Sequence, residues 1–150
     1  MKILSHVMRN INEFNIPAGN NQGYEILYFG VNLILMFDYR LAFDVEVKNS
    51  DNEIQVLILS RKAIPAWKEN YDDDTNNNEK SKINLLYYNK SGLKINDVFK
   101  PAVSDAYAFV INNRRSSIRH EVKTVEVTLI HNWQQEVKES QLKDRPKEQK

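Results

Sequence analysis

The sequence predicts an all-β protein: an antiparallel β-sandwich of the jelly-roll type with one short helical segment. Apolar and polar residues alternate in runs along most of the chain. Clusters of Asn, Asp, Gly, Ser and Pro separate these runs, and helical periodicity is rare. Seven or eight short strands at this spacing are typical of an antiparallel sandwich or barrel.

Length and composition limit the possible classes of protein. The chain has 150 residues, which is the size of one domain. Its 21 Lys and Arg residues against 20 Asp and Glu residues leave a net charge of +1, so no overall field attracts nucleic acid or membranes. It contains no cysteine, which excludes disulfides, Cys-ligated zinc and thiol catalysis. We expect a sandwich domain over 1–135 and a charged, disordered tail over 136–150.

The clearest strand is the run 41–48, where the apolar residues share one face and the charged residues share the other. Further strands are expected at 13–16, 24–29, 31–37, 54–59, 83–88, 107–111 and 125–129. One helical interruption is expected within 61–70, followed by a polar loop over 71–82. The residues predicted to be buried are Phe43, Val56, Tyr107, Phe109 and Val127.

The stretch Tyr107-Ala-Phe109-Val-Ile111-Asn-Asn113, followed by Ser116 and by Lys123-Thr-Val125, resembles the end of GOLD-type (Golgi-dynamics) β-sandwiches. The similarity is diffuse over 11–131, and Asn112 stands where the family usually has Asp. The resemblance implies a sandwich fold and a binding role. It does not imply cargo-receptor function, because the coiled coil and membrane anchor of those receptors are not seen in this sequence.

The one concentration of positive charge lies between two expected strands. Arg114, Arg115, Arg119 and Lys123 are the candidate contacts for an anionic partner. Arginine presents a planar fork that suits carboxylate or phosphate groups, although no aromatic residues are interleaved to stack on bases. The alternative is a solvated connection between strands. Asn113 and Ser116 are expected to hold this turn in place, since Asn tolerates left-handed dihedrals and Ser can cap the returning chain.

Two groups of residues raise the question of a metal site. Aspartates and asparagines alternate over 72–78 like the start of a calcium loop, but Asn77 replaces the required Gly and Ile83 replaces the bidentate Glu. The histidines, His6, His120 and His131, form no pair at metal-ligand spacing. We therefore expect neither a metal nor a cofactor, with weak calcium binding as the alternative for the loop.

Nothing in the sequence indicates catalysis. A nucleophile elbow is missing, and the glycines lack dinucleotide-binding and phosphate-loop spacing. Trp67, Trp133 and the pair 87–88 either line a ligand groove or pack in the core.

The sequence thus favours a non-enzymatic binding or interaction module that contacts a protein partner or itself. The alternative is contact with nucleic acid or another anion through 114–123. The longest apolar run, 26–37, is too short to span a bilayer as a helix, so we expect no membrane insertion and a cytoplasmic location.

Overall fold

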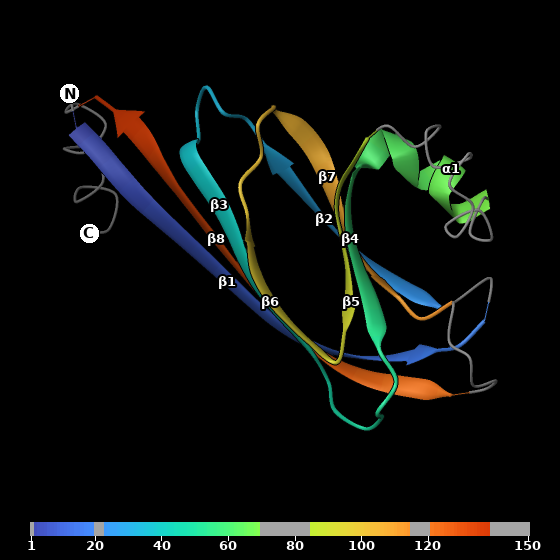
Figure 1. Ribbon diagram of the computed structural model, residues 1–150. Coiled ribbons are helices and arrows are strands. Elements are labelled where there is room, and N and C mark those ends of the chain that lie inside the picture. The colour runs from blue at the N-terminus through green and yellow to red at the C-terminus, as the bar shows by residue number, and fades with distance from the viewer. Residues whose placement is uncertain (1, 20–22, 70–84, 115–120, 139–150) are drawn as a thin grey trace, which may run out of the picture.

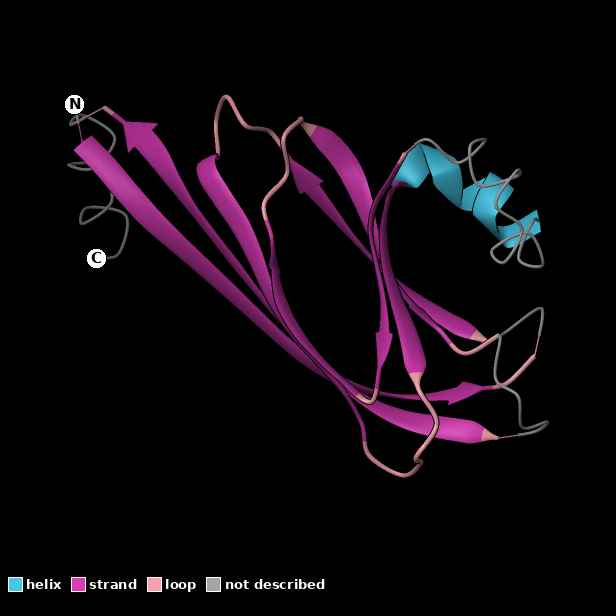
Figure 2. Cartoon of the chain, in the orientation of Figure 1, coloured by secondary structure: helices cyan, strands magenta, loops and turns pink. Residues whose placement is uncertain are grey.

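The computed structural model describes residues 2–19, 23–69, 85–114 and 121–138, which form a sandwich of two antiparallel β-sheets (Figures 1 and 2). The elements in chain order are β1 (Lys2–Pro17), β2 (Tyr24–Val31), β3 (Phe37–Val47), β4 (Ile54–Ser60), η1 (Arg61–Ala63), α1 (Ile64–Glu69), β5 (Leu86–Gly92), β6 (Lys94–Phe99), β7 (Asp105–Asn112) and β8 (Val122–Val137). Among these residues, no helix has the length and apolar character needed to cross a membrane.

The strand order is that of a jelly roll. Sheet A has the order β1-β8-β3-β6, and sheet B has the order β2-β7-β4-β5. Along the chain, β1 to β4 alternate between sheets A and B, β4 and β5 are neighbours in sheet B, and β5 to β8 alternate between the sheets again. Every neighbouring pair of strands is antiparallel. The predicted fold class, including the single short helical segment, is confirmed.

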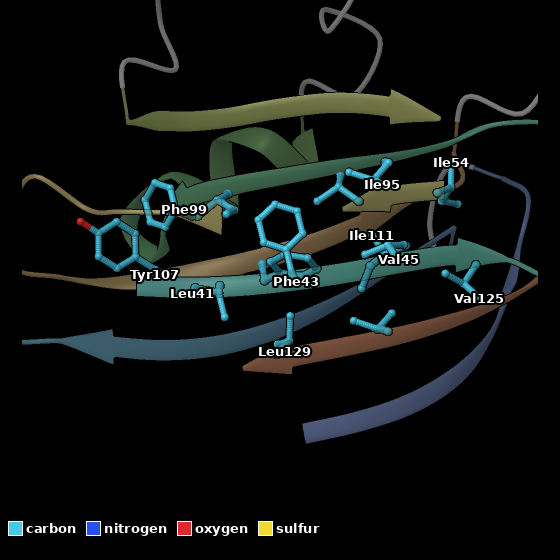
Figure 3. Packing of buried hydrophobic residues seen from close by; sticks show 14 of the residues in the cluster. Leu41, Phe43, Val45, Ile54, Ile95, Phe99, Tyr107, Ile111, Val125 and Leu129 are labelled. Carbon is cyan, nitrogen blue, oxygen red and sulfur yellow. The ribbon is translucent and has the colours of Figure 1, made fainter. Parts of the chain in front are cut away.

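The main core lies between the two sheets (Figure 3). In β3 the apolar residues of the alternating sequence are buried and the polar residues between them are more exposed. Leu41, Phe43 and Val45 face sheet B. Phe43 meets Phe109 of β7 edge to face, with ring centroids 5.1 Å apart. All five residues predicted to be buried are at most 3% exposed, which confirms the predicted core.

β4 is buried on both faces, which explains why its sequence is a continuous apolar run. Ile54, Val56 and Ile58 face sheet A, whereas Leu57 and Leu59 face outward. The helical segment covers this outer side and places Trp67 there at 1% exposure. Trp67 is therefore a core residue rather than part of a ligand groove.

One predicted strand is wrong. The run 31–37 was expected to be extended, but β2 ends at Val31 and a turn follows before β3. The Asn32 carboxamide oxygen accepts the backbone N–H of Ile34 at 3.0 Å, and its backbone carbonyl accepts the N–H of Met36 at 2.7 Å. Asn therefore ends the strand by bonding its own backbone, and Ile34 is left 86% exposed.

Several strand bounds also differ from expectation. The first strand begins at Lys2 and the last continues to Val137, which is 9% exposed and lies two residues beyond the expected domain boundary. The strand expected at 83–88 begins instead at Leu86 and continues to Gly92 as β5, and β6 was not predicted. Asn89 is tolerated in the strand because its carboxamide oxygen accepts a bond from Gln55 on β4. The loop 71–82 and residues 139–150 lie outside the described residues.

Candidate interaction surface

Arg114 follows β7 and is buried against the end of α1. Its guanidinium carbon lies 3.8 Å from the centroid of the Trp67 ring and 5.3 Å from that of Tyr24. Its two terminal nitrogens donate to the backbone carbonyls of Trp67 and Lys68 at 3.3 and 3.2 Å. These carbonyls belong to the last turn of the helix, where a cation satisfies otherwise unpaired acceptors. Arg114 thus ties the helix to sheet B.

Lys123 is fully buried at the start of β8. Its ammonium donates to the carboxamide oxygen of Asn113 and lies 3.1 Å from a carboxylate oxygen of Glu121. Partial burial alone would raise the pKa of the Glu121 carboxyl, but hydrogen bonds from Asn52, Lys123 and Ser50 outweigh this and lower the pKa. The ammonium therefore has an anionic partner within the chain, as a buried charge requires.

Asn113 connects three segments of the chain. Its side-chain nitrogen donates to the carbonyl of Ile16 at 2.9 Å and to that of Glu121 at 3.3 Å. Its backbone N–H donates to the carbonyl of Gly23 at 2.6 Å. Asn113 does not adopt the left-handed backbone dihedrals that the sequence suggested. Among the described non-glycine residues, a positive φ occurs at Asp38 (φ 56°).

The structure therefore brings only part of the predicted basic site together. Arg114 and Lys123 are 6% and 0% exposed, and both have partners inside the fold. Neither side chain is available for the expected contact with an anionic partner. Arg115, Arg119 and Ser116 lie outside the described residues, so an anionic contact through these two arginines stays a prediction.

His131 is a structural residue inside sheet A, 4% exposed. Its Nδ1 lies 2.5 Å from the hydroxyl of Tyr39. Burial raises the pKa of the Tyr39 phenol and lowers the pKa of the His131 imidazole, so both shifts favour the neutral form of each group, and the two share this buried hydrogen bond. Trp133 continues this aromatic group, with its ring 6.4 Å from that of Tyr39.

A different region, β1, has no hydrogen-bonded strand on one of its two edges within the described residues. The strand bonds to β8 on one side and ends sheet A on the other (Figure 1). Sixteen residues long, it has a single buried residue, Ile16, and every residue from Val7 to Glu13 is exposed. Ile11 and Val7 are 58% and 68% exposed. A long exposed edge of this kind is a template for pairing with another strand.

The register with β8 determines which backbone groups of β1 face that open edge. Just past the strand, the N–H of Ala18 donates to the carbonyl of Glu121 at 3.0 Å. Antiparallel residues bond to a neighbour in alternation, so the even-numbered residues of β1 bond to β8 and the odd-numbered residues direct N–H and C=O outward. Pro17, which lacks an N–H, accordingly occupies an odd position of the ladder.

The other edges of the sandwich are shorter, and two of them are held together. β6 has six residues and β5 has seven, compared with sixteen in β1. The Tyr88 hydroxyl of β5 donates to the Asp97 carboxylate of β6 at 2.9 Å, and the rings of Tyr87 and Phe99 lie 6.4 Å apart. These contacts join the two sheets along that side. On the other side β1 approaches β2 of sheet B, but among the described residues no strand is hydrogen-bonded to its free edge.

Two surface pockets are candidate sites for a ligand or a metal ion. One, of about 260 Å³, lies beside the stacked rings of His6 and Trp133. Another, of about 270 Å³, lies between Arg9 and Asp44 on the outer face of sheet A. Within the part of the chain that the structure describes, no three His, Asp or Glu residues are grouped so as to hold a metal ion. The 72–78 loop lies outside that part.

Comparisons with known proteins give little further guidance. No family model matches the sequence, and neither does any curated protein. Among solved structures, the chain is similar to one described as "Bacillus endospore appendages form a novel family of disulfide-linked pili". The identity is 7%, the match covers 89% of this chain and 92% of that chain, and the TM-score is 0.48. The resemblance to GOLD-type sandwiches is not tested by these matches and stays a prediction.

Proposed function

We propose that this chain is a non-enzymatic interaction module that binds a second copy of itself through the open edge of β1. The observation that supports this proposal is the row of outward N–H and C=O groups on the odd-numbered residues of β1. Natural sandwiches usually protect such edges with prolines, bulges, central charges or a short strand. β1 is sixteen residues long, pairs with β8 without a register shift, and has its proline at the end. Its central charges, Arg9 and Glu13, are of opposite sign and can therefore pair across such a contact.

The side chains of β1 also suit pairing better than solvation. Val7, Met8 and Ile11 are all about half exposed or more. Single exposed apolar residues are ordinary on protein surfaces, but here three occur within five positions of one open strand. Strand addition would pair the free backbone groups and cover this apolar surface at the same time.

Association should be measured by size-exclusion chromatography with light scattering over a wide range of concentrations. We expect the mass to rise from the monomer value of 17.6 kDa towards twice that value. Ile11→Pro removes one outward N–H without removing a bond to β8, and should leave a folded monomer. Ile11→Thr keeps that N–H and should still associate, although more weakly.

Two results would overturn the proposal. One is a wild-type mass that stays at 17.6 kDa at every concentration. The other is an Ile11→Pro variant that folds and associates as strongly as the wild type, which would place the contact elsewhere on the molecule.

A further inference from the structure

The register of a β1–β1 contact is restricted by geometry before any side chain is considered. Opposite residues of an antiparallel pair lie on the same face of the sheet. In β1 the odd-numbered residues share the outer face with Thr128 and Ile130 of β8, and the even-numbered residues share the inner face with Val127 and Leu129. A symmetric pair must therefore place odd opposite odd, so its two-fold axis passes through a residue and not between two residues.

The charged side chains of β1 then distinguish the possible positions of the two-fold axis. An axis at Arg9 or at Glu13 would place identical charges directly opposite each other. An axis at Asn10 sets Arg9 against Ile11, and an axis at Asn12 sets Ile11 against Glu13. With the axis at Ile11, each Arg9 faces the Glu13 of the other copy, and the two Ile11 side chains meet.

The residues involved are available for this contact. Arg9, Ile11 and Glu13 are exposed, and neither Arg9 nor Glu13 forms an ion pair within the described residues. The inner face is compatible with the same register. There Met8, 47% exposed, lies opposite the half-buried Phe14 of the other copy.

The backbone supports the same register. Ile11 is odd-numbered, so its N–H and C=O point outward and the two Ile11 residues form a hydrogen-bonded pair across the axis. The outward N–H groups from Ser5 to Asn15 all find carbonyls in this arrangement. Pairing ends where Ser5 meets Pro17, which has no N–H to donate.

We infer that two copies join β1 to β1 in an antiparallel register centred on Ile11, with reciprocal Arg9–Glu13 pairs. This inference rests on the proposed function. The two A sheets become one continuous sheet across the two-fold axis, and both B sheets remain unchanged. The partner is a second copy of this chain, because one strand carries both members of the charge pair at equal distances from the centre.

Cysteine cross-linking tests the register directly, since the wild-type chain has no cysteine. Cα atoms of a hydrogen-bonded antiparallel pair lie about 5.5 Å apart, within the range that a disulfide bridges. Ile11→Cys should therefore form a disulfide-linked dimer under mild oxidation. The two copies of Val7 would lie eight positions apart, or about 27 Å, so Val7→Cys should stay largely unlinked. Val98→Cys, at an exposed position of β6, is the matched control.

Charge reversal tests the pairing independently of any disulfide. Arg9→Glu turns two attractive pairs into two repulsive ones and should weaken association about tenfold or more. The combined Arg9→Glu and Glu13→Arg variant restores both pairs and the original net charge, and its dissociation constant should return to within about threefold of wild type. Lys94→Glu makes the same change in charge on β6 and should have no effect.

The outcomes separate the inference from the proposed function. If the wild type associates, but Asn10→Cys or Asn12→Cys links faster than Ile11→Cys, the register is overturned and the function of β1 stands. If the combined reversal is no tighter than Arg9→Glu alone, the charge pairing is overturned. A monomeric wild type overturns both the function and the register.

Discussion

β7 and β1 show the two extremes of how a strand can be accommodated in this fold. β7 pairs with β2 on one side and β4 on the other, and its residues from Tyr107 to Asn112 are all buried. β1 is twice as long, at sixteen residues against eight, but pairs on one side only and has a single buried residue.

The difference shows that the two strands contribute to different properties of the molecule. Substitutions in β7 remove packing from both sheets and should act on the free energy of unfolding. Substitutions at the outward positions of β1 remove no fully buried side chain from the monomer and should act mainly on association.

The largest effect is expected in β7. Phe109 is fully buried and packs against Phe43 at a centroid distance of 5.1 Å. Phe109→Ala should lower the free energy of unfolding by about 3–5 kcal/mol, because it leaves a cavity between the sheets. Urea titration monitored by circular dichroism measures this loss. A loss below about 1 kcal/mol would show that the two sheets are not tightly packed there.

A smaller loss is expected at the buried ammonium of Lys123. Lys123→Ala leaves the carboxamide oxygen of Asn113 without its donor and should cost about 1–3 kcal/mol. Lys48 pairs with Glu46 at 3.2 Å on the exposed face of the same sheet, so Lys48→Ala is the matched control. Chemical denaturation of both variants should show the larger loss for Lys123→Ala. Equal losses would contradict a structural role for the buried site.

Proline tests the alternation of backbone bonds within β1 itself. Asn12 is even-numbered and donates its N–H to β8, whereas the N–H of Ile11 points to solvent. In dilute monomer, Asn12→Pro should therefore cost about 1 kcal/mol more stability than Ile11→Pro, the value of one backbone hydrogen bond. Thermal and urea unfolding measure the difference. The reverse order would mean that the assignment of the open edge is wrong.

The smallest expected effect is a pH dependence of the free energy of unfolding that arises from His131. Burial holds the pKa of its imidazole below the ordinary 6.5, so the unfolded chain takes up a proton first as the pH falls. Stability should therefore decrease as the pH falls below about 6.5, by no more than about 1.4 kcal/mol per pH unit for one proton. Above that pH the contribution of His131 is constant.

His131→Gln removes this titration. The difference in unfolding free energy between the two proteins should therefore change with pH between 5 and 7.5. A constant difference would show that His131 titrates alike in the folded and unfolded chains.

The sequence predicted the sandwich well because most of its strands contact solvent on one face. In β3 the two-residue alternation of apolar and charged residues indicates both the strand and the buried face. The errors occurred where a side chain competed with that pattern. Asn32 ends β2 within an apolar run, and Asn89 continues β5 beyond the predicted end of that strand at residue 88.

The candidate site could be predicted only in part. Arg114 and Lys123 read as surface charges because the sequence does not show Trp67 or Asn113 beside them. An open strand edge is expected of any such sandwich, but the strand that forms it could not be identified, because alternation of side chains indicates a strand but not how many neighbours it has. The symmetry of Arg9 and Glu13 about Ile11 was visible in the sequence, but it acquires meaning only when β1 is known to end its sheet.

The measurement that tests the self-pairing of β1 most directly is residue-specific amide hydrogen exchange in β1 at two protein concentrations. In dilute monomer, the amides of Val7, Arg9, Ile11 and Glu13 should exchange fast, while those of Met8, Asn10 and Asn12 are protected by β8. At high concentration the odd-numbered amides should become protected and the even-numbered ones should change little. Odd-numbered amides that exchange equally fast at both concentrations would contradict the self-pairing of β1.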